Sequence, residues 1–127
     1  MQKHFVTIGA LLGGLAVVAG AFGAHGLKQH VTPDRLDIFH TGVEYQMYHA
    51  LALLLLAWRT SKDASQLPVI ASWCFIIGCI VFSGSLYLLV ILGQPWLGAI
   101  TPIGGVAFIV GWGCLMFSAW RKTPTQV

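Results

Sequence analysis

The sequence predicts an all-α membrane protein, a bundle of four transmembrane helices in which the second helix begins at the membrane interface. Apolar residues make up 57% of the 127-residue chain and charged residues 9%, whereas a soluble domain carries about a quarter. The 57 residues from Ala64 to Trp120 contain no Asp, Glu, Lys or Arg. A soluble chain of this size could not bury such a run, so lipid is expected to replace the core.

Four apolar stretches are long enough to cross a bilayer, because about 20 helical residues span about 30 Å of hydrocarbon. We expect one domain over residues 1–127, with spans at about 5–26, 38–58, 68–92 and 99–120. The second helix is expected to start at Pro33, with Thr32 as its cap and Asp34 in its first turn. Residues 93–96 predict a tight turn between the last two spans.

The first span carries small residues four apart, a spacing that lets another helix approach closely. The glycines assigned to helix packing are Gly9, Gly13, Gly20 and Gly23. Packing within one chain is the favoured interpretation, and a dimer face is the alternative. The segment also resembles a signal peptide, with Lys3 before the apolar run and small residues at 19–21.

Basic residues predict the orientation, because cytoplasmic flanks of membrane helices are enriched in Lys and Arg. Four spans place both termini on one side. That side carries five basic residues, Lys3, Arg59, Lys62, Arg121 and Lys122, and the other side carries two, Lys28 and Arg35. We therefore expect both termini in the cytoplasm and the chain in the bacterial cytoplasmic (inner) membrane.

Several functional classes have no support in the sequence. The net charge of +3 comes from short flanks, so no nucleic-acid partner is expected. Cys74, Cys79 and Cys114 lie in apolar runs and are expected to be small buried thiols. No metal-ligand spacing or nucleophile signature appears, and His25 and His49 differ too much in depth to hold a haem together. We expect no metal, no cofactor and no enzyme.

Polar residues from all four helices gather in the outer half of the predicted bundle. On the second helix, the residues around Glu44 form a wide arc that should face two neighbouring helices, and Gln46 points elsewhere. On the third, Ser83 and Tyr87 share a face with Cys79, and Ser85 points away from it. The candidate intramembrane polar site consists of His25, His40, Thr41, Glu44, Tyr45, Tyr48, His49, Ser83, Tyr87 and Thr101.

Glu44 is the acidic residue expected within the hydrocarbon, where a carboxylate costs roughly 3 kcal/mol on insertion scales. Three interpretations remain open. The carboxyl group is structural and held by His25, a tyrosine or a serine, or it is a proton or ion site, or it contacts a ligand in an outward-open pocket.

Four ordered motifs also carry a resemblance to a known family. They are GAFGAH at 20–25, TGVEYQ at 41–46 followed by His49, FSGSLY at 82–87 and TPIGG at 101–105. The chain resembles the small bacterial inner-membrane proteins grouped as domain of unknown function 423, and small animal transmembrane proteins are similar. The resemblance implies four spans with the first one retained, and it implies no activity.

The sequence thus predicts an integral membrane protein with a structural or accessory role, whose partners are the lipid bilayer and a second copy or another membrane protein. The alternative is a small transporter or a proton- or ion-conducting protein that uses Glu44 and His25, as a dimer.

Overall fold

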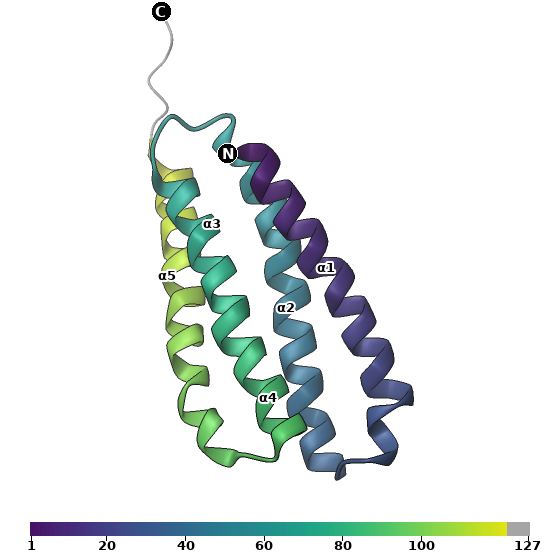
Figure 1. The fold of residues 1–127 in the computed structure, drawn as a ribbon. Helices are drawn as coiled ribbons and strands as arrows, with labels where there is room; N and C mark the ends of the chain where they lie inside the picture. The colour runs from purple at the N-terminus through teal and green to yellow at the C-terminus, as the bar shows by residue number, and fades with distance from the viewer. Residues whose placement is uncertain (122–127) are drawn as a thin grey trace, which may run out of the picture.

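The computed structural model describes residues 1–121, and these form four long, antiparallel helical segments (Figure 1). Short 3₁₀ turns, η1 (Leu27–Gln29) and η3 (Pro95–Ala99), lie in two of the connections. The long segments are α1 (Gln2–His25), α2 (Pro33–Thr60), α3 to α4 (Leu67–Gly78 and Gly84–Leu92, joined by the π-helix η2, Cys79–Ser83) and α5 (Thr101–Trp120). The all-helical prediction is confirmed for this part of the chain.

The expected end signals of α2 and α4 act as predicted. The Thr32 hydroxyl accepts a hydrogen bond from the backbone N–H of Arg35 at 3.4 Å, with Pro33 at the first helical position. Gly93 ends α4 with φ 65°, in the left-handed region that glycine adopts without strain. Both ends are determined by local residues, so the sequence alone could predict them.

The third segment departs from a regular helix. It is helical from Leu67 to Leu92 as expected, but η2 interrupts it with one wide turn at Cys79–Ser83. Such turns accommodate one extra residue and change the direction of the side chains that follow. Phe82, in this turn, packs against Gly104 of α5 so closely that a Cβ at Gly104 would overlap its backbone. The irregular turn and the glycine of α5 therefore fit each other.

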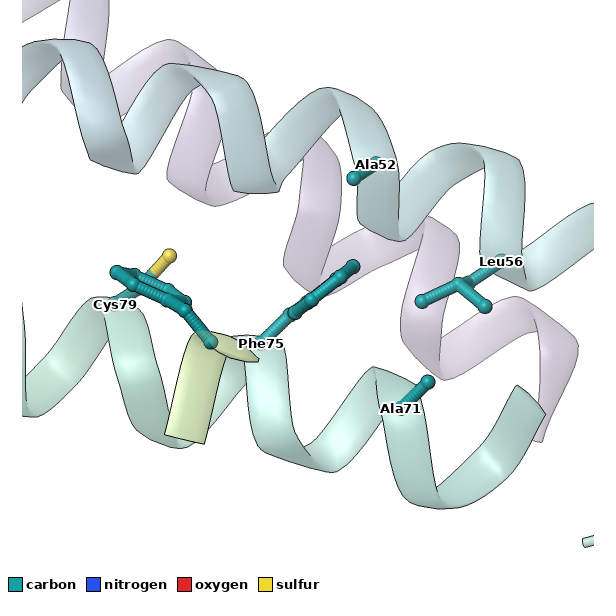
Figure 2. Packing of buried hydrophobic residues seen from close by; sticks show 6 residues of the cluster. Ala52, Leu56, Ala71, Phe75 and Cys79 are labelled. Carbon is teal, nitrogen blue, oxygen red and sulfur yellow. The ribbon is translucent and has the colours of Figure 1, made fainter. Parts of the chain in front are cut away.

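The helices α2 and α3 lie at the centre, α1 packs mainly on α2, and α5 packs mainly on α3 (Figure 1). The main hydrophobic cluster joins α2, α3 and α5. It consists of Ala52, Leu56, Ala71, Phe75, Cys79 and Phe108, five of which are labelled in Figure 2. Phe75 is fully buried there, and its ring also meets Gly111 of α5.

The small residues of α1 lie against α2. A Cβ added at Gly9 would come within 2.9 Å of Leu54, and one added at Gly23 within 3.0 Å of Phe39. Gly13 and Gly20 have looser space, 3.8 Å from Ala50 and 3.4 Å from Val43. The tighter approaches belong to α3 and α5, where Gly78 and Gly111 meet the rings of Phe108 and Phe75. These two close approaches were not predicted from the sequence.

Among the described residues, three helical segments are long and apolar enough to cross a membrane: Gln2–Gln29, Leu67–Leu92 and Pro95–Trp120. The helix α2 has the length, 28 residues, but not the apolarity, because the part before Ala50 carries both charged and uncharged polar residues, among them Asp37, Glu44, Gln46 and His49. Of the basic residues used to predict the orientation, Lys122 lies outside the described residues.

Candidate functional site

The polar residues of α2 lie on two opposite faces of the helix, because successive residues turn by about 100°. The inward face carries Arg35, Phe39, Gly42 and Gln46. The outward face carries Asp37, Thr41, Glu44 and Tyr48. Gln46 is 6% exposed and Tyr48 is 55% exposed, so the first face lies inside the bundle and the second lies on its surface.

Gln46 connects three helices through its amide group. Its Nε2 donates to the backbone carbonyl of Leu12 in α1 at 2.8 Å. Its Oε1 accepts from the hydroxyl of Tyr87 in α4 at 2.7 Å. Hydrogen bonds of this kind join helices in an apolar environment, where water cannot replace them. Gln46 therefore belongs to the polar interior, although the sequence analysis left it out of the site.

His49 lies at the centre of an aromatic cluster. Its Nδ1 is 2.7 Å from the carbonyl oxygen of Tyr45, which can only accept, and its Nε2 is 3.0 Å from the indole N–H of Trp112, which can only donate. These partners assign the neutral tautomer with the proton on Nδ1. The ring stacks on Phe108 with centroids 3.6 Å apart. Both nitrogens are engaged, so His49 has no free position for a metal or a haem.

Two further hydrogen bonds made by hydroxyl groups join neighbouring helices. Ser83, in η2, donates to the carbonyl of Gly42 at 2.6 Å. Ser85 and Thr101 share a hydrogen bond of 2.6 Å between α4 and α5. Ser83 and Tyr87 thus turn toward α2 while Ser85 turns toward α5, which is the division expected from their spacing.

Glu44 lies on the exposed outward face, and no hydrogen bond or ion pair engages it within residues 1–121. The structural interpretation of Glu44, one of the three left open, therefore has no support in the described residues. On the same face, the Thr41 hydroxyl donates to the Asp37 carbonyl at 3.0 Å, a bond within α2 alone. The centre of the predicted arc therefore faces outward instead of facing neighbouring helices.

The other predicted residues divide between the two flanks of this face. Tyr45, 39% exposed, stacks on Phe82 with centroids 4.7 Å apart. His40 turns toward α1, where its Nε2 is buried against Gly23 without a partner in the described chain. His25 is exposed at the end of α1. The ten residues thus form several separate contacts and not one cluster around Glu44.

A polar cluster that was not predicted from the sequence lies at the opposite end of the bundle. Ser118, 1% exposed, donates to the carboxylate of Asp63, and Arg59 donates to the Ser118 carbonyl at 2.9 Å. Arg59 and Asp63 also form an ion pair of 3.9 Å. The Ser118 hydroxyl, followed by the backbone N–H of Ser65, holds the pKa of the Asp63 carboxyl below its usual range. Arg59 and Asp63 lie four residues apart, but Ser118 comes from the end of α5, so no local spacing predicted the whole cluster.

Metal coordination finds no support in the described residues, where no three His, Cys, Asp or Glu side chains converge. Cys74, Cys79 and Cys114 are free thiols. The arrangement that remains is a polar interior whose groups are mostly satisfied and an exposed face whose carboxyl group is not.

Most of the chain matches a known family. The family described as protein of unknown function DUF423 matches residues 19–105 of the chain. The chain belongs to this family. The resemblance inferred from the four motifs is therefore confirmed.

Similar proteins are found in several bacteria. The chain is 46% identical over 119 residues to the UPF0382 membrane protein YwdK of Bacillus subtilis, covering 93% of this chain and 97% of that protein. It is 38% identical over 123 residues to a UPF0382 membrane protein of Haemophilus influenzae, covering 96% and 98%. No solved structure matches the chain. The protein is thus an integral membrane protein of a family without an assigned biochemical role.

Proposed function

We propose that this protein is a four-span, non-enzymatic accessory protein of the bacterial cytoplasmic membrane that acts by lateral association through the outward face of α2. Three helices have the length and apolarity of spans. The helix α2 lies between α1 and α3 and, with 28 residues, is about 42 Å long. A helix of this length, packed between two spans, is expected to cross the bilayer beside them.

The proposed orientation has both termini in the cytoplasm, on the strength of five basic residues at that end against two at the other. A fluorescent protein that folds only in the cytoplasm, fused after Val127, should fluoresce, and alkaline phosphatase fused there should be inactive. The reverse pattern contradicts the orientation.

The observation that carries the functional proposal is a contrast between exposed faces. On the other long segments, the side chains exposed in the middle of the bundle are apolar: Leu11, Leu15 and Val18 of α1, Ile77, Ile80 and Leu88 of α3 to α4, and Val106, Ile109 and Val110 of α5. Lipid can cover all of these. The outward face of α2 instead exposes Glu44, about 16 Å along the helix from Pro33.

A carboxyl group at this depth costs roughly 3 kcal/mol unless something other than lipid covers it. A second copy is the partner that the chemistry of this face favours. Two copies inserted in the same orientation, related by a two-fold axis along the membrane normal, bring equal depths together. Glu44 of one copy would then lie near Thr41 and Tyr48 of the other, whose hydroxyls can hydrogen-bond a carboxylic acid.

The test is site-specific photo-cross-linking in native membranes. A photoreactive phenylalanine analogue at Tyr48 should give an adduct of twice the protein's mass. The matched control is the same analogue at Ile77, which is 50% exposed on the apolar side of α3 and should react with lipid only. An adduct with a different protein would support the accessory role and show that the partner is that protein and not a second copy. Lipid adducts alone at both positions contradict lateral association.

A second candidate function is proton or ion movement through Glu44. The observation in its favour is the line of carboxyl groups on the outward face, Asp37 and then Glu44, which leads inward from the end of α2. His25, the other residue first assigned to this role, lies at the end of α1 and is not engaged with Glu44. Flux into proteoliposomes that disappears in Glu44→Gln would favour this candidate over the accessory role.

A further inference from the structure

A second surface, independent of the outward face, lies between α1 and α4 on the inward side of α2. Two adjoining cavities, of about 720 and 440 Å³, share Phe22 and Ile91 in their walls. They therefore form one continuous groove, which begins at the end of the bundle near Gly93 and extends toward Cys79 in the middle. The groove is open because α1 packs mainly on α2 and leaves α4 uncovered.

The inner part of this groove is apolar. Its walls include Leu15, Val18 and Ala19 of α1 and Ile80, Gly84 and Ile91 of the third segment. Gln46 and Tyr87 also line it, but each satisfies the other through their 2.7 Å hydrogen bond. An occupant of this part gains contact area and needs no hydrogen-bonding group.

The mouth of the groove is basic. Arg35 and His30 line it, and a Cβ added at Gly93 would lie 3.1 Å from the Arg35 guanidinium, so this group lies over the end of α4. Within residues 1–121 the guanidinium has no hydrogen bond or ion pair. The nearest acidic residue on its own helix is Asp34, which is exposed one position earlier, and Asp37 lies on the opposite face. An unpaired guanidinium is suited to bind a phosphate through two parallel hydrogen bonds.

We propose that this groove binds an anionic glycerophospholipid, with the phosphate at Arg35 and His30 and one acyl chain between α1 and α4. From Cys79 to Ile91 the groove wall is about 18 Å long at 1.5 Å per residue, close to the roughly 15 Å of one leaflet's hydrocarbon. Arg35 lies in the first turn of α2, where a bilayer crossed by the four helical segments would place its headgroups. The charge at the mouth and the apolar length below it match the two parts of such a lipid.

The groove offers a substitution that blocks it without disturbing the packing. Gly84 lines the groove, and a Cβ added there meets nothing within 4 Å. Leucine at this position should fill the groove and, in a helix, replace glycine favourably. Gly113 of α5 has the same open surroundings and does not line the groove, so Gly113→Leu is the matched control. Arg35→Gln removes the charge, and Lys28→Gln is its control outside the groove lining.

The experiment is native mass spectrometry of the purified full chain with phosphatidylglycerol or phosphatidylcholine. The wild type should retain phosphatidylglycerol about tenfold better than phosphatidylcholine, and Arg35→Gln should lose this preference. Gly84→Leu should lose both lipids, and Gly113→Leu and Lys28→Gln should behave as wild type. Melting temperatures without lipid identify any variant that fails to fold. If Arg35→Gln fails to fold, Arg35→Lys replaces it. Lysine keeps the charge without the planar guanidinium, so this variant should show a reduced preference for phosphatidylglycerol over phosphatidylcholine.

Three outcomes would overturn the proposal. The first is equal retention of the two lipids by the wild type. The second is wild-type binding by Gly84→Leu. The third is displacement of phosphatidylglycerol by millimolar inorganic phosphate, because the site would then recognise a free anion and not a lipid.

Discussion

The inward and outward faces of α2 differ in where their polar groups find partners. On the inward face, the amide of Gln46 bonds to Leu12 and Tyr87, and the carbonyl of Gly42 accepts from Ser83. On the outward face, Glu44 has no partner in the described chain. Gln46 is neutral, so it can be satisfied by single contacts inside one bundle. A carboxyl group on a lipid-facing surface, whether charged or protonated, needs a partner outside the chain.

The largest expected effect is on the inward face. A Cβ at Gly42 would lie 2.8 Å from the Tyr87 ring, so Gly42→Leu must push α2 away from α4 and weaken the Ser83 hydrogen bond. We expect a loss of about 3 kcal/mol in unfolding free energy, the upper end for overpacking. Thermal unfolding in detergent measures it. Thr41→Leu, one position earlier and on the outward face, is the control and should leave the melting temperature near that of the wild type.

A smaller effect is expected when an inward polar side chain is replaced by an apolar one. Gln46→Leu leaves the Tyr87 hydroxyl without its partner and removes the interhelical hydrogen bond to the Leu12 carbonyl, which should lower the unfolding free energy by about 1–2 kcal/mol. A double-mutant cycle with Tyr87→Phe isolates the hydrogen bond. Strictly additive effects of the two substitutions would show that the bond contributes nothing.

The Asp63 cluster supplies a comparison with a polar group near water. Its carboxyl pKa is lowered in the folded state, chiefly by the Ser118 hydroxyl, so the stability that it contributes is present above about pH 4 and is lost as the pH falls through the lower, folded pKa. Melting temperatures at pH 7 and pH 3 should therefore differ less in Ser118→Ala than in the wild type. An unchanged difference would mean that Ser118 does not stabilise the carboxylate.

The smallest effect is expected at Glu44. Because no group of the described chain depends on its carboxyl, Glu44→Gln and Glu44→Leu should both fold, with unfolding free energies of the monomer within about 0.5 kcal/mol of the wild type. Thermal unfolding measures this, with the protein diluted in excess detergent so that it is monomeric. If Glu44→Leu alone prevents folding of the monomer, the outward face has an internal partner and the contrast between the two faces is incorrect.

The ends of the helices could be predicted because they depend on neighbours in the chain. Thr32 and Pro33 start α2 and Gly93 ends α4, and each acts through residues within one turn. The π-helix at Cys79–Ser83 could not, since it accompanies the contact of Phe82 with Gly104 from another helix. The α3 to α5 contacts at Gly78 and Gly111 depend in the same way on residues far away in the sequence.

The candidate site was only partly predictable for a related reason. Glu44 stands out in the sequence by its charge, whereas the polar groups that are buried in the fold are those that find hydrogen-bond partners inside the bundle. Gln46 shares its helix face with Gly42 and Leu53. Because these neighbours on the face are apolar, the sequence did contain an indication that Gln46 points inward. His49 was identified, but its neutral tautomer depends on Trp112, which lies 63 residues away.

The low apolarity of α2 has a consequence for biogenesis. A segment leaves the translocon for lipid according to its own hydrophobicity, and α2 lacks the apolarity that the other three segments have. It follows α1 after only residues 26–32 and packs along the glycines of α1, with Gln46 bonded to the Leu12 carbonyl. We expect the two helices to insert as one helical hairpin. Gly9 and Gly23 would then govern how much protein reaches the membrane, before they affect how stable it is once there.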